Sequence, residues 1–269
     1  MSLDDRTLGE LREIAGRYPE ARSGLLPMLH LVQAVQGRVT PEGIEACAEI
    51  LDISPAEVSG VATFYTMYKR HEVGDYHVGV CTNTLCAVMG GDAIRARLEE
   101  HLEIGNDEVA EKRQGDARTV SLEHVECNAA CDYAPVVMVN WEFMDNQTPE
   151  SAVQMVEALR AGHEVRSTRG PRLCTWREAE RVLAGFPDGL VDEGPTAGAA
   201  SLAGLEIARE RGWTAPDPGV SATEDDVADD KQEAVARADT GRAEAETVEQ
   251  TTDSATSGER ANEKGDDRG

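Results

Sequence analysis

The chain has 269 residues, a formal net charge of -25 and an aromatic content of 4%. This length allows one or two domains, each with a hydrophobic core of its own. The acidic excess comes without any cluster of lysine and arginine residues, which excludes a nucleic-acid partner because phosphate binding depends on such clusters. The low aromatic content indicates that part of the chain does not fold into a core.

The N-terminus and the cysteine content indicate a reducing, cytoplasmic setting. Residues 1–14, MSLDDRTLGELREI, are acidic where a signal peptide would have a basic start and an apolar run. No stretch approaches the roughly 20 apolar residues that span a bilayer, so we expect no direct membrane insertion. Structural disulfides are rare in such a compartment, and the six cysteines therefore point to metal binding or redox chemistry.

Residues 1–72 are expected to form an N-terminal helical domain. Apolar residues recur at helical spacing over residues 8–15 and again over residues 25–35. Thr40 offers a capping hydroxyl and is followed by a proline at the first helical position. Residues 54–57, SPAE, form a complete capping box, which predicts another helix start.

Residues 75–165 change to the pattern of an α/β domain. A strand-like run over residues 76–80 leads into Cys81, and a second run over residues 119–126 leads into Cys127 in the same way. The sequence also predicts a helix, a buried strand, a turn and a second helix, at residues 94–102, 135–139, 145–147 and 148–162. The resulting order of strand, helix, strand, strand, strand, helix describes a small α/β sheet with packed helices, compatible with a thioredoxin-like architecture.

The remaining residues fall into two parts. Residues 166–219 contain two short helical signals, a capping box at Thr175 and an apolar pattern over residues 201–211. Because neither helix has an evident core of its own, we expect this extension to be a docking strap for a sister subunit. Residues 220–269 contain 15 acidic and 6 basic residues and no leucine, isoleucine or aromatic residue. They are expected to form a disordered acidic tail.

Four of the cysteines form two close pairs. Four residues separate Cys81 from Cys86, and three separate Cys127 from Cys131. A dithiol oxidoreductase needs Cys-x-x-Cys and a Rieske centre needs histidine ligands, so the sequence disfavours both. Structural zinc stays open, since two cysteine pairs can supply four thiolates. A 2Fe-2S cluster is favoured because its bridging sulfides need hydrogen-bond donors nearby. The loops offer such donors at Thr82, Asn83, Thr84 and Asn128.

Three motifs resemble the E subunit of bacterial NADH-quinone oxidoreductase, the small 2Fe-2S protein of respiratory complex I. They are VGVCTNTLC ending at Cys86, ECNAACDYAPV beginning just before Cys127, and SPAEVSGVATFY over residues 54–65. The resemblance covers about residues 5–165. It ends before the extension, to which nothing is carried over.

The resemblance implies a fold, a cofactor and partners. It implies a helical N-terminal part followed by a thioredoxin-like domain with one 2Fe-2S cluster. Cys81 and Cys86 would ligate one iron, and Cys127 and Cys131 the other. NADH and FMN would bind the neighbouring flavoprotein, the F subunit, so no catalytic residue is expected in this chain and the chain alone should not oxidise NADH. Other subunits of the peripheral arm of complex I are further expected partners, and the complex would hold the chain on the cytoplasmic face of the inner membrane.

Two alternatives remain at this point. The equivalent subunit of an NAD-linked hydrogenase or formate dehydrogenase would use the same fold and the same four cysteines. A more remote alternative is a zinc-stapled scaffold without a redox role. Iron and acid-labile sulfide in the purified protein would separate the zinc scaffold from the other two.

The other cysteines and the acidic residues beside the pairs have simpler interpretations. Cys47 lies among apolar residues of a predicted helix, and Cys174 stands alone in the extension, so neither is expected to bind metal. Abundant carboxylates near the loops, such as those of Glu126 and Asp132, are expected to keep the reduction potential of the cluster low, because reduction adds charge to an already anionic group.

Overall fold

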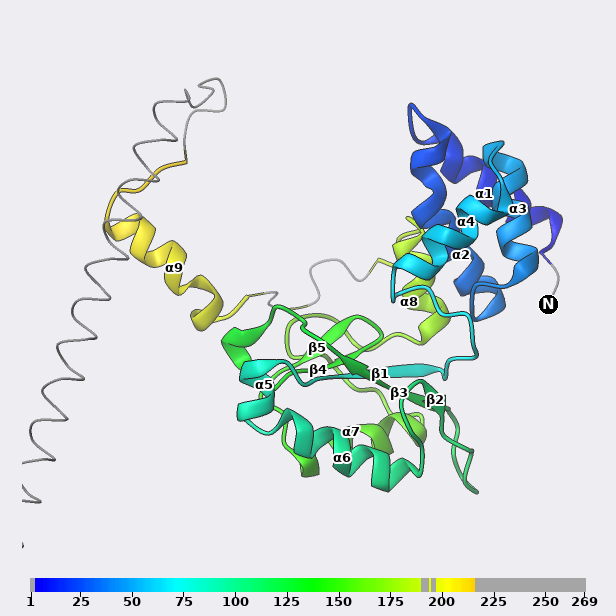
Figure 1. Ribbon diagram of the computed structural model, residues 1–269. Coiled ribbons are helices and arrows are strands. Elements are labelled where there is room, and N and C mark those ends of the chain that lie inside the picture. Colours follow the sequence, from blue (N-terminus) through cyan, green and yellow to red (C-terminus); the bar gives the residue numbers. More distant parts are fainter. Residues whose placement is uncertain (1–2, 190–193, 195–196, 216–269) are drawn as a thin grey trace, which may run out of the picture. The chain divides into compact units, whose positions relative to one another are not determined.

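The computed structural model describes residues 3–189, 194 and 197–215 (Figure 1). The chain divides into two units, Met1–Ile207 and Ala208–Gly269, and the sheet and the four paired cysteines belong to the first. The predicted acidic tail at residues 220–269 lies outside the described residues. Within the described ranges, no helix combines the length and apolar character needed to cross a membrane.

The N-terminal part of the first unit is a set of packed α-helices, as the sequence predicts. In chain order they are α1, Asp5–Gly16, α2, Leu25–Gln36, α3, Pro41–Leu51, and α4, Pro55–Phe64, with a short 3-10 turn at Ala21–Gly24. The Thr40 hydroxyl accepts a hydrogen bond from a backbone N–H of α3, and Ser54 and Glu57 form the predicted capping box of α4. Both predicted helix starts are confirmed.

The apolar faces of these helices meet in one core. Its buried members include Leu11, Ile14, Met28, Leu29, Leu31, Val32, Ile44, Cys47 and Val58. Burying a leucine or isoleucine side chain stabilises a fold by about 1.5–3 kcal/mol, and helices of this length depend on such packing. Cys47 is fully buried, and burial raises the pKa of its thiol to about 12, as expected of an inert packing residue.

A five-stranded mixed sheet forms the centre of residues 75–165. Its strands are β1, Tyr76–Cys81, β2, Glu108–Val109, β3, Val120–Val125, β4, Val137–Val139, and β5, Glu142–Met144, in the spatial order β2-β3-β1-β4-β5. Strands β1 and β3 are parallel, with Cys81 opposite Val125, whereas β4 is antiparallel to β1. Because parallel strands end at the same edge of a sheet, the loops that follow β1 and β3 begin next to each other.

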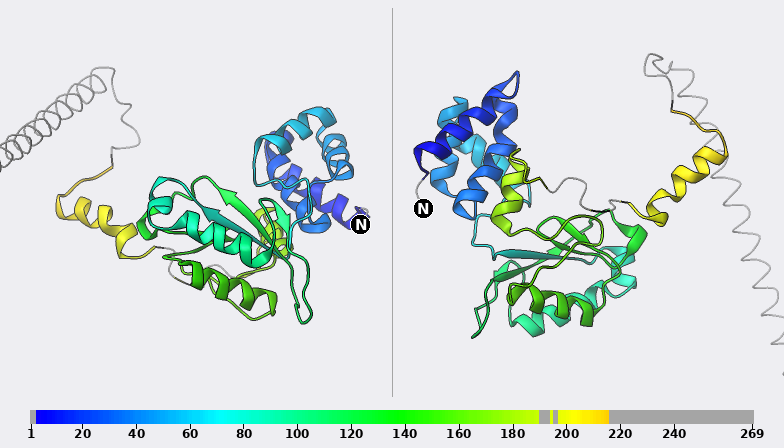
Figure 2. Two further views of the ribbon diagram at one scale, coloured as in Figure 1. Left: turned by 60° about the horizontal axis from the view of Figure 1, so that its bottom comes forward. Right: turned by 180° about the vertical axis from the view of Figure 1, so that it is seen from behind.

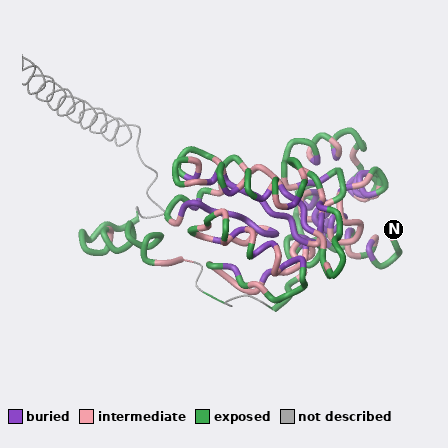
Figure 3. The backbone as a smooth tube through the Cα atoms, turned by 90° about the horizontal axis from the view of Figure 1, so that it is seen from below, coloured by how far each residue is buried: buried purple, intermediate pink, exposed green. Residues whose placement is uncertain are grey.

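Two helices cover one face of this sheet. They are α6, Gly91–Leu102, and α7, Pro149–Arg160, and both lie on the same side of the strands in Figure 1 and Figure 2. Figure 3 shows that the strands are the buried centre of the domain. The buried residues between sheet and helices include Val78, Val80, Ile94, Leu98, Leu122, Val137, Val139, Val156 and Leu159. The predicted α/β fold with a thioredoxin-like domain is confirmed.

Two elements of this domain were not predicted. Helix α5, Thr84–Val88, contains Cys86, and the two-residue strand β2 pairs with β3. Both are too short to show a hydrophobic period, which needs a window of about 11 or more residues for a helix. The addition of α5 places Cys86 on a helix, where the sequence had indicated only a loop.

The extension contains α8, Trp176–Leu183, and α9, Ala199–Glu210. The capping box at Thr175 is confirmed, and α8 packs against α2 of the same chain. It buries Trp176 and Glu180, so the premise that this helix has no core within its own chain is wrong. Helix α9 has no buried residue, and its use as a docking strap stays a prediction.

Candidate metal centre

The four paired cysteines are carried by the two loops that leave β1 and β3. Cys81 is the last residue of β1, and Cys86 lies on α5. Cys127 follows the end of β3, and Cys131 begins a short 3-10 turn, Cys131–Tyr133. The parallel pairing of β1 and β3 therefore explains how cysteines 46 residues apart in the sequence reach one edge of the sheet.

The two pairs differ in exposure. Cys81 and Cys86 are 3% and 2% exposed, and together with Ala134 they form a small apolar cluster separate from the two larger cores. Cys127 and Cys131 are exposed, and all four are free thiols. A metal centre held by these four cysteines would therefore have two buried ligands and two exposed ligands.

The thiols interact across the two loops. Burial raises the pKa of the Cys86 thiol to about 11, with further contributions from the neighbouring Cys81 and Cys131. Cys86 therefore lies near Cys81 of its own pair and near Cys131 of the second pair. Within the described ranges, no three cysteine, histidine, aspartate or glutamate side chains converge tightly enough to hold a single metal ion.

Backbone groups of the loops face the sulfur atoms. Ala129 N donates a hydrogen bond to Cys127 Sγ at 3.3 Å. The Cys81 thiol donates to the carbonyl oxygen of Glu126 at 3.7 Å. Ala129 reaches its position with a left-handed backbone, φ 51°, a conformation that is uncommon for alanine. The sequence could not show which backbone N–H acts as the donor, because a backbone N–H leaves no signal in the side-chain pattern.

One of the side-chain donors predicted from the sequence is buried at the site without a partner. Asn128 lies between Cys127 and Cys131, and its Nδ2 atom has no hydrogen-bond acceptor. A buried amide N–H without a partner costs about 1–3 kcal/mol, so such a group calls for an explanation. This N–H group is therefore available to an acceptor that the described residues do not supply.

Gly91 allows α6 to start directly against the first cysteine loop. A Cβ atom at this position would lie 2.5 Å from the carbonyl oxygen of Cys81 and 2.9 Å from that of Cys86. Both contacts are with backbone atoms, which cannot move aside as a flexible side chain can. The glycine therefore keeps the loop that carries both cysteines close to the end of α6.

A buried polar cluster supports the strands that lead to the cysteines. His77 Nε2 donates to Glu123 Oε2 at 2.7 Å, and His77 Nδ1 accepts from the Ser121 hydroxyl at 2.8 Å. Lys69, 4% exposed, forms an ion pair with Glu123 at 2.5 Å. Burial lowers the pKa of His77. This histidine is therefore a structural residue with both ring nitrogens hydrogen-bonded.

We expect the stability of the chain to fall as the pH drops from about 7.5 to 5.5, partly through His77. The folded state holds the pKa of His77 below the value of about 6.5 in the unfolded chain. In this window the unfolded state binds more protons, so acidification favours unfolding. Denaturant unfolding of the full chain at several pH values measures the effect. In His77→Gln the pH dependence should be weaker, whereas His163→Gln, at an exposed histidine, should behave like the unaltered chain. Equal slopes for all three proteins would contradict this prediction.

Comparisons with known proteins place the chain in a family. A sequence profile of the thioredoxin-like 2Fe-2S ferredoxins matches residues 11–160. The E subunit of NADH-quinone oxidoreductase from Mycobacterium tuberculosis is 57% identical over 208 residues, 77% of this chain and 81% of that protein. The E subunit of the same enzyme from Rickettsia bellii is 36% identical over 162 residues, 59% of this chain and 94% of that protein. A crystal structure of an NAD+-reducing NiFe-hydrogenase matches with a TM-score of 0.42 and 20% identity, over 52% of this chain and 23% of that chain.

The profile match spans more than half of the sequence and includes all four paired cysteines. The identity to the mycobacterial protein extends over most of both chains. These two findings confirm the resemblance that the three sequence motifs carry. The chain belongs to the family of thioredoxin-like 2Fe-2S ferredoxins.

Proposed function

We propose that this chain is the electron-transfer subunit of a respiratory NADH:quinone oxidoreductase and binds one 2Fe-2S cluster. Cys81 and Cys86 ligate one iron in this proposal, and Cys127 and Cys131 ligate the other. NADH and FMN bind the partner flavoprotein, the F subunit, with which the cluster exchanges electrons. The chain alone therefore does not oxidise NADH, and its complex holds it on the cytoplasmic face of the inner membrane.

One observation carries the proposal. Two pairs of free cysteines follow two parallel neighbouring strands, in a chain that is 57% identical to a protein named as the E subunit of NADH-quinone oxidoreductase. Two pairs on two loops match a cluster with two irons, each of which takes two thiolates. A single zinc ion would need all four thiolates around one point.

The groups around the cysteines fit such a cluster. The thiol of Cys86 has a raised pKa because it is buried, so its thiolate requires a positive partner, which a coordinated metal supplies. The buried Nδ2 of Asn128 is available as a donor to a cluster sulfide, and the Ala129 N–H already faces a ligand sulfur. When bound, the cluster would accept and release a single electron.

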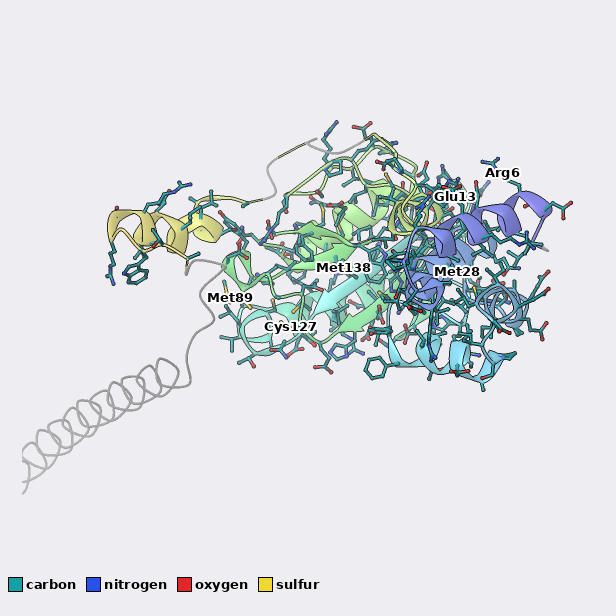
Figure 4. The ribbon with its side chains drawn as sticks, turned by 90° about the horizontal axis from the view of Figure 1, so that it is seen from above. Arg6, Glu13, Met28, Met89, Cys127 and Met138 are labelled. Carbon is teal, nitrogen blue, oxygen red and sulfur yellow. The ribbon has the colours of Figure 1, made fainter. Side chains whose placement is uncertain are left out.

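The surface beside Cys86 supports a protein partner at this edge. Leu85, Val88 and Met89 of α5 and its C-cap are 42%, 80% and 53% exposed. Figure 4 labels Met89 and Cys127 at the same end of the domain. A group of neighbouring exposed apolar side chains beside a redox site is typical of a protein contact, because a partner that covers them removes apolar surface from water. We refer to these three residues as the α5 patch.

A charge in the α5 patch should weaken the complex with the flavoprotein subunit. We expect Val88→Asp to raise the dissociation constant at least tenfold, about 1.4 kcal/mol, because the interface would have to bury an unpaired carboxylate. Val88 is 80% exposed in the chain alone, so its substitution leaves the cluster spectrum unchanged. Val182→Asp on α8, at a valine that is 38% exposed, is the matched control. Equal affinities for both variants would count against the α5 patch as the contact.

The proposed function is tested by spectroscopy and metal analysis of the purified chain. We expect an EPR signal after reduction with dithionite, and about two iron and two acid-labile sulfide atoms per chain. In membranes, removal of the chain should abolish NADH-dependent quinone reduction, and the full chain should restore it. Zinc without sulfide would establish a structural metal site instead. Copurification with an enzyme that reduces NAD with hydrogen or formate would establish the related hydrogenase or dehydrogenase complex.

A further inference from the structure

A loop of the extension returns to the edge of the sheet that carries the cysteines. Arg166 and Arg172 pair as an isolated β-bridge, which closes the loop. Between them, Thr168 N and Thr168 Oγ1 both donate to the carbonyl oxygen of Phe143 on β5, at 3.0 and 2.9 Å. We refer to residues 166–172 as the return loop. It lies beyond residue 160, where the match to the family profile ends.

Arg169 at the tip of the return loop is held on four sides. Its Nη2 donates to Asp132 Oδ1 at 2.7 Å, and its Nε donates to both oxygens of Asp145 at 3.0 and 2.9 Å. The guanidinium carbon lies 5.2 Å from the ring centroid of Tyr133 and 5.4 Å from that of Phe143. The side chain is only 16% exposed. Arginine suits this position because its planar group can bind two carboxylates while it lies over aromatic rings.

These contacts reach the short turn that contains Cys131. Asp132 and Tyr133 are the other two residues of that turn, and Arg169 touches both. The second carboxylate oxygen of Asp132 accepts a hydrogen bond from Ser201 on α9. Asp132 is thus bound from two sides, by the Arg169 guanidinium and by the Ser201 hydroxyl. Arg169 and Ser201, which lie beyond the residues matched by the family profile, therefore hold Asp132, the residue next to the proposed ligand Cys131.

We propose that Arg169 is a positioning residue for the 2Fe-2S cluster, which anchors the Cys131–Tyr133 turn and places a lasting positive charge beside the ligand. The inference rests on the proposed function. An added electron makes an anionic cluster more negative, so a nearby positive charge favours the reduced form and raises the reduction potential. The sequence alone indicated that Asp132 lowers this potential; in the structure its charge is compensated by Arg169.

The test is a redox titration of the loaded full chain, followed by EPR. We expect Arg169→Gln to have a lower midpoint potential than the unaltered chain, because Asp132 and Asp145 lose their counter-charge. Arg169→Lys keeps the charge and should stay closer to the unaltered value. Arg172→Gln is the matched control, since it removes the same charge from the same loop at a residue that lines a pocket with Cys174. Its potential should not change.

The outcomes separate this inference from the function on which it rests. An unaltered chain without a 2Fe-2S signal would overturn the proposed function. A normal signal with equal potentials in the unaltered chain and Arg169→Gln, or with equal shifts in Arg169→Gln and Arg172→Gln, would overturn the role of Arg169. If Arg169→Gln fails to retain the cluster, Asp132→Asn decides the question. That variant leaves Arg169 with less opposing charge and should raise the potential, and an unchanged potential would refute the proposal.

Discussion

Replacement of Cys86 by alanine should abolish the 2Fe-2S cluster. Loss of a hydrogen-bond partner of a ligand lowers metal affinity roughly 10–100-fold, so loss of the ligand itself should lower it by more than about 100-fold. The neighbouring thiols offer no substitute, because Cys81, Cys127 and Cys131 are each assigned to the cluster already and Cys47 is buried in the core of the helical part. Iron and acid-labile sulfide per chain, together with the EPR signal of the reduced protein, measure the loss.

Two further variants show whether Cys86 acts as a ligand or only as a packing residue. Cys86→Ser has almost the same volume but offers oxygen, so it should retain at most a weakly bound cluster with a changed EPR spectrum. Cys174→Ala removes a half-buried thiol of the extension and should leave the cluster content unchanged. If Cys86→Ala bound as much iron and sulfide as the unaltered chain, the assignment of the four ligands would be wrong.

The sequence predicted those parts of the fold that depend on neighbouring residues. The capping box at Ser54 and the strand that ends at Cys81 are local patterns, and both occur in the structure. The parallel pairing of β1 with β3 is different, since it joins segments more than 40 residues apart. The cysteine pairs indicated a shared four-thiolate site, but the register that brings the two loops together could not be predicted, because spacing along the chain does not show which strands pair.

The charged residues whose roles sequence analysis missed share one property: their partners are distant in the chain. Glu180 lies in the run WREAERVL, where it has the appearance of a solvent-facing glutamate, yet it is fully buried against residues almost 150 positions earlier. Arg169 lies in a polar segment and contacts Asp132, 37 positions before it. No local pattern distinguishes a charged residue that faces water from one that completes a distant buried network.

Glu180 should make the largest single polar contribution to the stability of the chain. Its carboxylate accepts hydrogen bonds from His30 Nδ1 at 2.6 Å, Gln33 Nε2 at 2.7 Å and Trp141 Nε1 at 2.9 Å. These donors belong to α2 and to the turn between β4 and β5, so α8 connects the helical part with the sheet. Gln33 also accepts from Lys69 N at 2.6 Å, which extends the network to the segment before β1.

We expect Glu180→Ala to lower the free energy of unfolding by about 3–5 kcal/mol, because it leaves buried donors without an acceptor. For a chain of this size that corresponds to a fall of roughly 6–20 °C in the melting temperature. Glu180→Gln keeps one acceptor oxygen, but its amide NH2 group would face donors that contacted the other carboxylate oxygen. We therefore expect an intermediate fall in the free energy of unfolding. Denaturant unfolding monitored by circular dichroism measures all variants.

Glu13→Ala on α1 is the control. Glu13, which Figure 4 labels, is 59% exposed, and its ion pair with Arg17 lies at the surface. A pair of this kind contributes at most about 0.5 kcal/mol. The Glu180 network connects α8 to α2 and to the turn after β4, but includes none of the four paired cysteines. Its loss should therefore reduce stability while the EPR signal of the loaded chain stays the same. Equal stabilities of Glu180→Ala and Glu13→Ala would show that α8 is held by its apolar contacts, such as those of Trp176, and not by the buried carboxylate.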